Sequence, residues 1–440
     1  MSMKDVMVEF SKRGPKCRAE TERASEHLPL GSPGGLGMFV LPHELFIERG
    51  EGCHVWDADG NKYLDFFCGD WTAALGYCNP GIMAAINEQV AKGTTFGLPS
   101  VDLGAELAGL INERLPSVEM VRFTSSGTEA NQNSLRMARA FTGRKKSAKL
   151  SGGYHGSTDE LTIQNAINKP DDIPAGMPIG AQESLVLLPP NDIAACKEII
   201  EREKDDLAAV LFEPVMGVAG FIPNTHEYVQ FMREITEKYG ILLIFDEVVT
   251  IPMGVGGAQG YYGVKPDLTT MGKVMGGGTP LAAYGGRKDV MGMLDFRIKD
   301  PKLPAMMIGS TYGGMPLCLA AGIAAMKQLT PEVHAHLDKT GDYMRDGINT
   351  LGKKHNVPLQ ATGLSQFTGI HWTETEVVDY PSFLMSDRNV IRNIMYALAL
   401  HGSIGTPMGQ FLNTTPMTSA DIDFFLNGLE QALRDIDLIS

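Results

Sequence analysis

The sequence lacks the features of several large protein classes. It has no apolar stretch long enough to cross a bilayer, and its N-terminal segment mixes charges without the apolar core of a signal peptide. It also lacks a long basic run, since the net charge is -14 and the densest basic cluster is Arg144-Lys145-Lys146. Binding of a phosphate backbone needs clustered lysine and arginine. We therefore expect a cytoplasmic protein that binds neither a membrane nor a nucleic acid.

Patterns typical of metal sites are missing as well. The six cysteines form no CxxC pair and do not have the spacing of a zinc site. The ten histidines include one close pair, His334 and His336, but no cysteine or carboxylate cluster completes a ligand set. We expect reduced cysteines and no metal.

Buried strands alternate with amphipathic helices in the middle of the chain. The apolar runs at residues 184–188, 207–212 and 241–245 are separated by helical patterns that begin near Asn191 and continue through Tyr239. Strands that are apolar on both faces and alternate with helices indicate a parallel sheet covered on both sides. Ligands of such sheets bind at the carboxyl ends of the strands.

The length of 440 residues favours two domains, because single hydrophobic cores stop growing below this size. The pattern places the large domain at residues 56–326. Residues 327–440, with a strand near 366–372 and helices near 388–400 and 418–436, are expected to form a small domain. Residues 1–55 are expected to be an N-terminal arm and part of the small domain.

A Ser/Gly/Thr run follows one apolar segment of the predicted sheet. Residues 125–129, SSGTE, come after the strand-like residues 120–123 and before a helical pattern at residues 130–141. Unpaired backbone N–H groups, hydroxyls and the positive end of a helix dipole together bind phosphate. Plain capping of the helix by serine or threonine is the alternative interpretation.

An acid and a lysine follow two further strand-like segments. Asp246 comes directly after an apolar run and precedes Glu247, so one of these acids is expected to have a cationic partner. Lys273 lies among glycines and apolar residues after the run at 268–271. Considered alone, Asp246 can be interpreted as a turn residue and Lys273 as a solvated loop residue. An amine in a pocket of low polarity, however, can form a Schiff base with an aldehyde.

Together, the three features fit one cofactor. Pyridoxal 5'-phosphate (PLP) has a phosphate, a ring nitrogen that an aspartate can keep protonated, and an aldehyde. Tyr154, on the glycine-rich turn at 151–156, could stack on one face of its ring, and Val248 could pack on the other face because it points to the same side as Asp246. Ordinary packing is the alternative for both residues.

These stretches resemble class III, fold-type I aminotransferases over most of the chain, nearest to glutamate-1-semialdehyde aminomutases and β-amino-acid transaminases. The matching segments are 52–66, 123–131 (FTSSGTEAN), 151–156 (SGGYHG), 211–217 (LFEPVMG), 242–250 (LLIFDEVVT), 256–291 and 310–316 (STYGGMP). The resemblance implies an α/β fold, with a large domain built on a mostly parallel seven-stranded sheet and a small α/β domain.

The resemblance also implies roles for single residues around the pyridine ring. Lys273 would form the Schiff base and carry the proton, while Asp246 would pair with the pyridinium nitrogen. Tyr154 and Val248 would sandwich the ring, and Glu213 would stand near the cofactor's hydroxyl group.

For the phosphate, the resemblance implies a site shared between two subunits. Ser126, Gly127 and Thr128 would hold the phosphate, and Thr311 would reach it from the neighbouring subunit. We therefore expect a homodimer with active sites at the interface.

Two loops differ from the pattern of the β-amino-acid enzymes, which bind a substrate carboxylate with arginines. The corresponding segments here are residues 31–37, GSPGGLG, and 406–409, TPMG. A pocket without these arginines favours an amine or carbonyl substrate without a carboxylate. Arg122 or Arg287 are other candidates for binding a carboxylate. We expect a ping-pong aminotransferase; the alternatives are a glutamate-1-semialdehyde 2,1-aminomutase and a non-catalytic PLP-binding relative.

Overall fold

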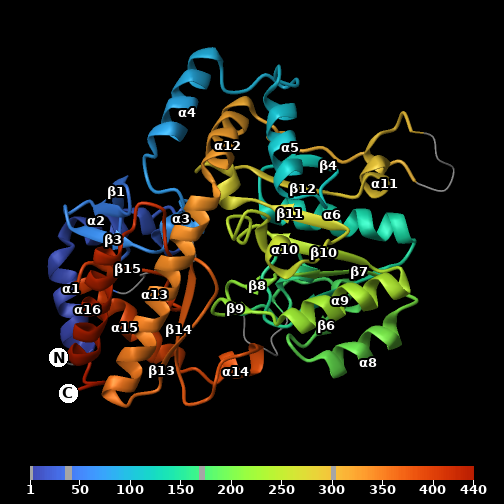
Figure 1. Cartoon of the computed structure of the whole chain (residues 1–440). Helices are drawn as coiled ribbons and strands as arrows, with labels where there is room; N and C mark the ends of the chain where they lie inside the picture. Colours follow the sequence, from blue (N-terminus) through green and yellow to red (C-terminus); the bar gives the residue numbers. More distant parts are fainter. Residues whose placement is uncertain (1–2, 35–41, 168–173, 299–303) are drawn as a thin grey trace. The chain divides into compact units, whose positions relative to one another are not determined.

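The computed structural model describes residues 3–34, 42–167, 174–298 and 304–440 (Figure 1), and it divides into two compact units. Unit 2 comprises residues 80–335 with 378–380, and unit 1 comprises residues 1–79, 336–377 and 381–440. The predicted substrate-facing segment 31–37 lies partly outside the described residues. Within the described part, no helix combines the length and apolar character that a membrane span requires.

Unit 2 contains a seven-stranded sheet with the strand order β4-β12-β11-β10-β7-β5-β6. All neighbours from β11 to β6 pair in parallel, whereas β12 is antiparallel to both β11 and β4. The predicted mostly parallel seven-stranded sheet is therefore confirmed. Its strands are β4 (Met120–Thr124), β5 (Lys146–Leu150), β6 (Leu185–Leu188), β7 (Leu207–Phe212), β10 (Leu242–Glu247), β11 (Leu268–Met271) and β12 (Ala282–Gly286).

Helices follow the strands of unit 2 as the alternating pattern predicts. They are α4 (Pro80–Lys92), α5 (Leu103–Arg114), α6 (Gly127–Thr142), α7 (Ile179–Glu183), α8 (Ile193–Glu203), α9 (His226–Tyr239), α10 (Gly257–Tyr262), α11 (Lys288–Met291) and α12 (Pro316–Gln328). Short 3-10 helices lie at η2 (Glu160–Thr162), η3 (Lys273–Gly276) and η4 (Gly292–Leu294), and β8 (Val215–Met216) pairs with β9 (Ile222–Pro223).

The sheet of unit 2 buries both of its faces. On one face, Leu211 of β7, Ile244 of β10 and Leu268 of β11 form a cluster with the apolar side of α6. Side chains alternate between the faces of a strand, so Phe212 and Phe245 point to the other face, where α9 packs against β10. Burial on both faces explains why these strands are almost continuously apolar in sequence.

Unit 1 has its own core around two smaller sheets. β1 (Ile47–Glu51), β2 (His54–Asp57), β3 (Lys62–Asp65) and β15 (Ser403–Ile404) form one sheet, and β13 (Leu359–Thr362), β14 (Phe367–Trp372) and β16 (Gln410–Leu412) form the other. The helices are α1 (Met3–Arg13), α2 (Pro15–Ser25), η1 (Pro29–Gly31), α3 (Cys68–Trp71), α15 (Arg388–Leu400) and α16 (Ser419–Asp435), with most of α13 (Pro331–His355) and of α14 (Tyr380–Leu384). The rings of Phe66, Phe411 and Phe425 meet in the core.

The division between the units differs from the predicted domain limits. It falls after Asn79 and after Ala335, whereas the sequence placed it near residues 55 and 326. Residues 56–79 lie in unit 1 because β2 and β3 form one antiparallel pair, and β3 also pairs with β15 near the C-terminus. A pattern read along the sequence does not reveal a strand pairing over such a long separation.

Candidate active site

The register of the sheet gathers polar side chains at one edge of unit 2. Phe212 of β7 lies beside Phe245 of β10, so the next residues along, Glu213 and Asp246, are neighbours. Asp246 in turn pairs with Thr270 of β11. Residues paired across strands point to the same face of a sheet. Glu213, Asp246 and Thr270 therefore share the face covered by α6, at the carboxyl ends of parallel strands.

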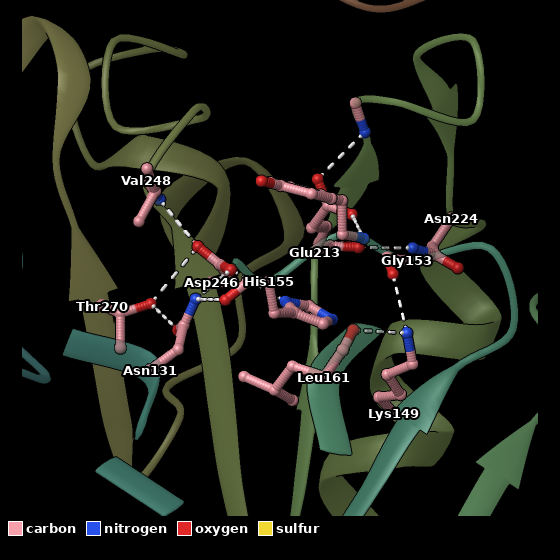
Figure 2. A network of polar contacts seen from close by, with 12 residues as sticks. Asn131, Lys149, Gly153, His155, Leu161, Glu213, Asn224, Asp246, Val248 and Thr270 are labelled. Carbon is pink, nitrogen blue, oxygen red and sulfur yellow. Dashed lines mark hydrogen bonds and ion pairs between the residues drawn. The ribbon is translucent and has the colours of Figure 1, made fainter. Parts of the chain in front are cut away.

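Asp246 is the centre of a hydrogen-bonded network (Figure 2). Its Oδ2 accepts from Asn131 Nδ2 and from His155 Nδ1, each at 2.8 Å. Its Oδ1 accepts from the backbone N–H of Val248 at 3.1 Å and from the Thr270 hydroxyl at 3.3 Å. These hydrogen bonds hold the Asp246 carboxylate, which is only 4% exposed, in one orientation.

His155 is a hydrogen-bond partner of Asp246, but it is not the cationic partner that the sequence predicted for one of the two acids. It is buried beside Asp246, and burial lowers the pKa of the imidazole despite the opposing effect of the carboxylate. A neutral ring that donates from Nδ1 to Asp246 leaves Nε2 as a buried nitrogen that has no hydrogen-bond partner among the described residues. The contact of His155 with Asp246 is thus a hydrogen bond from a neutral ring.

Glu247, the second acid, belongs to a different environment on the opposite face of β10. Its carboxylate accepts from the backbone N–H groups of Ala258 and Gln259 and from the side chains of Gln259 and Thr250. Burial raises the pKa of Glu247. The adjacent acids are thus separated by the alternation of the strand, and only Asp246 faces the α6 side.

Glu213 holds the turn that carries Tyr154. Its Oε2 accepts from the backbone N–H of Tyr154 at 2.9 Å, and its Oε1 accepts from that of Gly217 at 3.1 Å. Burial and, secondarily, the negative charge of Asp246 raise the pKa of Glu213 to about 8. The carboxyl of Glu213 therefore gains a proton much more readily than an exposed glutamate.

The N-terminus of α6 lies at the same edge of the sheet. Ser126 caps the helix, since its hydroxyl accepts from the N–H of Glu129 at 3.2 Å and its C=O accepts from the N–H of Ala130. Within the described residues, the N–H groups of Gly127 and Thr128 remain available to a ligand. The capping interpretation and the anion site are therefore compatible, because they use different groups.

Val248 lies between the two glycines that border this site. A Cβ on Gly127 would lie 3.0 Å from Val248 Cγ2, and one on Gly272 would lie 3.2 Å from Val248 Cγ1. Side chains larger than hydrogen would displace Val248 at both positions. Val248 thus connects the start of α6 with the residue that precedes Lys273.

Lys273 begins η3, two residues after β11 ends, and is half-buried. It has a φ of +50°, which is uncommon for a residue with a side chain and is found often at functional sites. Because β11 pairs with β10 up to Glu247, Lys273 lies at the same edge of the sheet as Asp246. The geometry places an amine, a buried carboxylate and a helix N-terminus at this edge.

Comparison with known proteins identifies the family to which the chain belongs. The model of the family described as aminotransferase class-III matches residues 40–433. The chain belongs to the class-III aminotransferase family. A glutamate-1-semialdehyde 2,1-aminomutase from Bacillus pumilus is 37% identical over 96% of this chain and 98% of its own length.

Solved structures support the same family assignment. An omega-transaminase from Sphaerobacter thermophilus superposes with a TM-score of 0.90 at 35% identity, covering 97% of this chain and 99% of that one. A β-phenylalanine aminotransferase from Variovorax paradoxus superposes with a TM-score of 0.90 at 32% identity, covering 99% of this chain and 97% of that one. This class-III aminotransferase is therefore similar both to proteins named as transaminases and to a protein named as an aminomutase.

Sequence reasoning did not assign a role to several residues of this class-III aminotransferase site. Asn131 and His155 lie inside the motifs FTSSGTEAN and SGGYHG, and Thr270 lies within β11, yet only their contacts with Asp246 indicate what they do. Thr311, predicted to act from a neighbouring subunit, is exposed in the single chain. It follows Ser310, whose hydroxyl donates to Glu129 in the first turn of α6.

Apart from the candidate site in unit 2, two cysteine-containing clusters in unit 1 have ligand atoms within 4.8 Å of one another. They consist of Cys53, His54 and Asp421, and of Cys17, Asp57 and Asp59. Burial raises the pKa of both Cys17 and Cys53 to about 11, so both thiols keep their protons.

Proposed function

We propose that the chain is a PLP-dependent aminotransferase in which unit 2 binds the cofactor and Lys273 is the catalytic lysine. The observation that supports this most strongly is the four-donor network of Asp246 at the same sheet edge as Lys273. The reaction moves an amino group between an amine or amino acid and a keto acid, aldehyde or ketone by a ping-pong route. Bound PLP would supply the electron sink for this chemistry.

The residues present fit PLP at two points, its phosphate and its ring nitrogen. The free N–H groups of Gly127 and Thr128, with the hydroxyls of Ser126 and Thr128, would hold the phosphate. Asp246 would hold a proton at the pyridine nitrogen, because a buried carboxylate stabilises an adjacent cation. This fit supports one orientation of the cofactor, with its phosphate at α6 and its nitrogen at β10.

The remaining residues would orient the ring and move protons. Val248, packed between Gly127 and Gly272, would contact one face of the ring, and Tyr154, which is 36% exposed, would cover the other. Glu213 would stand beside the cofactor's hydroxyl side. Lys273 Nζ would accept and return the proton that leaves the substrate carbon.

We propose a homodimer in which Thr311 of each chain reaches the phosphate held by the partner. Large apolar side chains of unit 2 are exposed in the single chain, with Leu98 78%, Val101 85% and Met307 93% accessible. Apolar surface of this kind is typical of subunit interfaces. Six free cysteines, five of them buried, fit the reducing cytoplasm that we propose as its location.

The test of the proposed reaction is amino transfer from a panel of amines and amino acids to a keto acid. We expect turnover with at least one donor that has no carboxylate, because the segments 31–37 and 406–409 contain no arginine. Turnover that requires a carboxylate on every donor would show that another residue binds it. Of the two arginines that the sequence offered, Arg287 is unsuitable, because it lies beside the start of β11, away from the carboxyl ends of the strands, and pairs with Asp267 and Asp289.

The alternative activity is that of a glutamate-1-semialdehyde 2,1-aminomutase, which the 37% identity to the Bacillus pumilus protein favours. This reaction moves the amino group within one molecule, so it proceeds without an added keto acid. Conversion of glutamate-1-semialdehyde in the absence of any acceptor would support the aminomutase. A non-catalytic PLP-binding relative would bind PLP and give turnover in neither assay.

A further inference from the structure

Lys149 is a completely buried lysine of unit 2 that has no part in the roles described so far. It lies on β5 and points to the α6 face, since it pairs with Leu211 of β7. Its Nζ donates to the backbone carbonyls of Gly153 at 3.0 Å and Leu161 at 3.1 Å (Figure 2). Burial of a lysine is costly, so a position of this kind calls for a specific reason.

Lys149 and Glu213 bind the two sides of the same peptide group. The carbonyl of Gly153 accepts from Lys149 Nζ, while the N–H of Tyr154, which belongs to the same peptide, donates to Glu213 Oε2 at 2.9 Å. A hydrogen bond at each end fixes both the position and the tilt of a peptide plane. Because both side chains are buried, water does not compete for either bond.

The position of this peptide determines where two other side chains lie. Tyr154 follows it directly, and His155 is the next residue. A Cβ on Gly153 would lie 3.1 Å from His155 Nε2, so the ring of His155 packs closely against the Gly153 backbone. The opposite nitrogen of that ring, Nδ1, donates to Asp246 at 2.8 Å. Figure 2 shows the ring of His155 between Asp246 and the Lys149 side of the network.

We propose that Lys149 and Glu213 form a positioning pair that holds the Gly153–Tyr154 peptide, and through it sets the Tyr154 ring and the His155 contact with Asp246. The inference rests on the proposed PLP site, because Tyr154 and Asp246 would contact the cofactor. Lys149 itself touches no reacting atom and acts through the backbone. The pair therefore affects how tightly and in which orientation the cofactor binds.

The electrostatic surroundings agree with a dry, closely coupled pair. Burial lowers the pKa of Lys149 to about 7, and the negative charge of Glu213 opposes this effect. Burial raises the pKa of Glu213 to about 8, and the charge of Lys149 opposes it in the same way. Removing either side chain takes away one of the two buried hydrogen bonds of the Gly153–Tyr154 peptide.

The test compares Lys149→Met with a control on the same strand. Methionine has a similar length and keeps the buried volume, but it donates no hydrogen bond. The control is Lys146→Met, which removes a lysine from the other end of β5, where its Nζ meets Glu203 at 2.6 Å in a partly exposed ion pair. Three quantities are measured: the dissociation constant of PLP, the visible circular dichroism per bound PLP, and the urea midpoint of the protein without PLP.

We expect Lys149→Met to weaken PLP binding roughly tenfold, a loss typical of removing a hydrogen bond that orients the residues in contact with a ligand. The visible circular dichroism per bound PLP should also change, because this signal depends on the orientation of the ring. Lys146→Met should leave both quantities at their wild-type values. A Lys149→Met protein with a lower urea midpoint but wild-type affinity and dichroism would overturn the proposal and make Lys149 merely structural.

A second variant keeps the proposal testable if Lys149→Met does not fold. Glu213→Gln keeps one side-chain oxygen, which can accept from the N–H of Tyr154. The second oxygen is replaced by an NH2 group, which cannot accept from the N–H of Gly217, so one of the two hydrogen bonds is lost. We expect weaker PLP binding and faster hydrogen exchange at the Tyr154 amide. Unchanged values for both would contradict the proposal. A wild-type protein that binds no PLP would instead refute the proposed function itself.

Discussion

Asn131 is the residue whose replacement tests the Asp246 network most sharply. Its Nδ2 donates to Asp246 Oδ2 and to the backbone carbonyl of His155, and its Oδ1 accepts from the Thr270 hydroxyl at 2.7 Å. All of these groups are buried. Asn131→Leu keeps the approximate volume and removes the three hydrogen bonds together.

The expected loss follows from the bonds that are removed. A hydrogen bond to a charged group contributes about 1.5–3 kcal/mol, and each buried group left without a partner costs about 1–3 kcal/mol. Allowing for relaxation of the Thr270 hydroxyl toward Asp246, we expect Asn131→Leu to lower the free energy of unfolding by about 3–5 kcal/mol. Thr270→Val removes only one hydroxyl and should cost about 1–2 kcal/mol.

The assay is urea denaturation of the PLP-free protein, followed by far-ultraviolet circular dichroism. Tryptophan fluorescence is unsuitable, because Trp56, Trp71 and Trp372 all lie in unit 1 and report little of unit 2. A loss below about 1 kcal/mol for Asn131→Leu would refute the reasoning, since it would mean that the bonds at Asp246 contribute no more than surface contacts. So would a larger loss for Thr270→Val than for Asn131→Leu.

Two further predictions concern a helix start and a surface cluster. A Cβ at Gly127 would lie 3.0 Å from Val248 Cγ2, so Gly127→Ala should weaken PLP binding by roughly tenfold. The control is Gly109→Ala on α5, where the added Cβ meets open space and the affinity should not change. Equal affinities of the two variants would show that Val248 does not contact the cofactor. Lys354, Arg434 and His355 lower the pKa of Glu430 to about 2. The lowered pKa of Glu430 stabilises the fold at pH values above 4.5, the usual pKa of a glutamate, and this stabilisation is lost as the pH falls toward 2. Glu430→Gln should therefore lower the free energy of unfolding by roughly 1 kcal/mol at pH 7 and leave it unchanged near pH 2. Urea denaturation followed by tryptophan fluorescence, which reports unit 1, checks this, and a cost that does not change with pH would contradict it.

Much of unit 2 could be predicted from local patterns. The runs at 184–188, 207–212 and 241–245 correspond to β6, β7 and β10, because strands buried on both faces are continuously apolar. The rule for the carboxyl ends of parallel strands also brings residues 125–129, Asp246 and Lys273 to one edge of the sheet. These predictions needed only short-range information.

The remaining features depend on contacts between distant parts of the chain. The assignment of residues 56–79 to unit 1 follows from the pairing of β3 with β15, which joins residues more than 300 positions apart. Lys149 looks like one more charged residue in KSAKL, and its burial becomes visible only when β5 is placed between β6 and β7. The alternation that separates Asp246 from Glu247 could be predicted, but the identity of their partners could not.

The central claim is that Lys273 binds PLP covalently at the sheet edge where Asp246 lies. The most direct measurement is the absorbance spectrum of the purified protein and of Lys273→Ala, each supplied with PLP, followed by borohydride reduction and peptide mass spectrometry. The account predicts a band at the visible edge in the wild type alone, bleached by an amine donor, and a reduced PLP adduct on the peptide that contains Lys273. A band that is the same in Lys273→Ala, or an adduct on another lysine, would contradict the account.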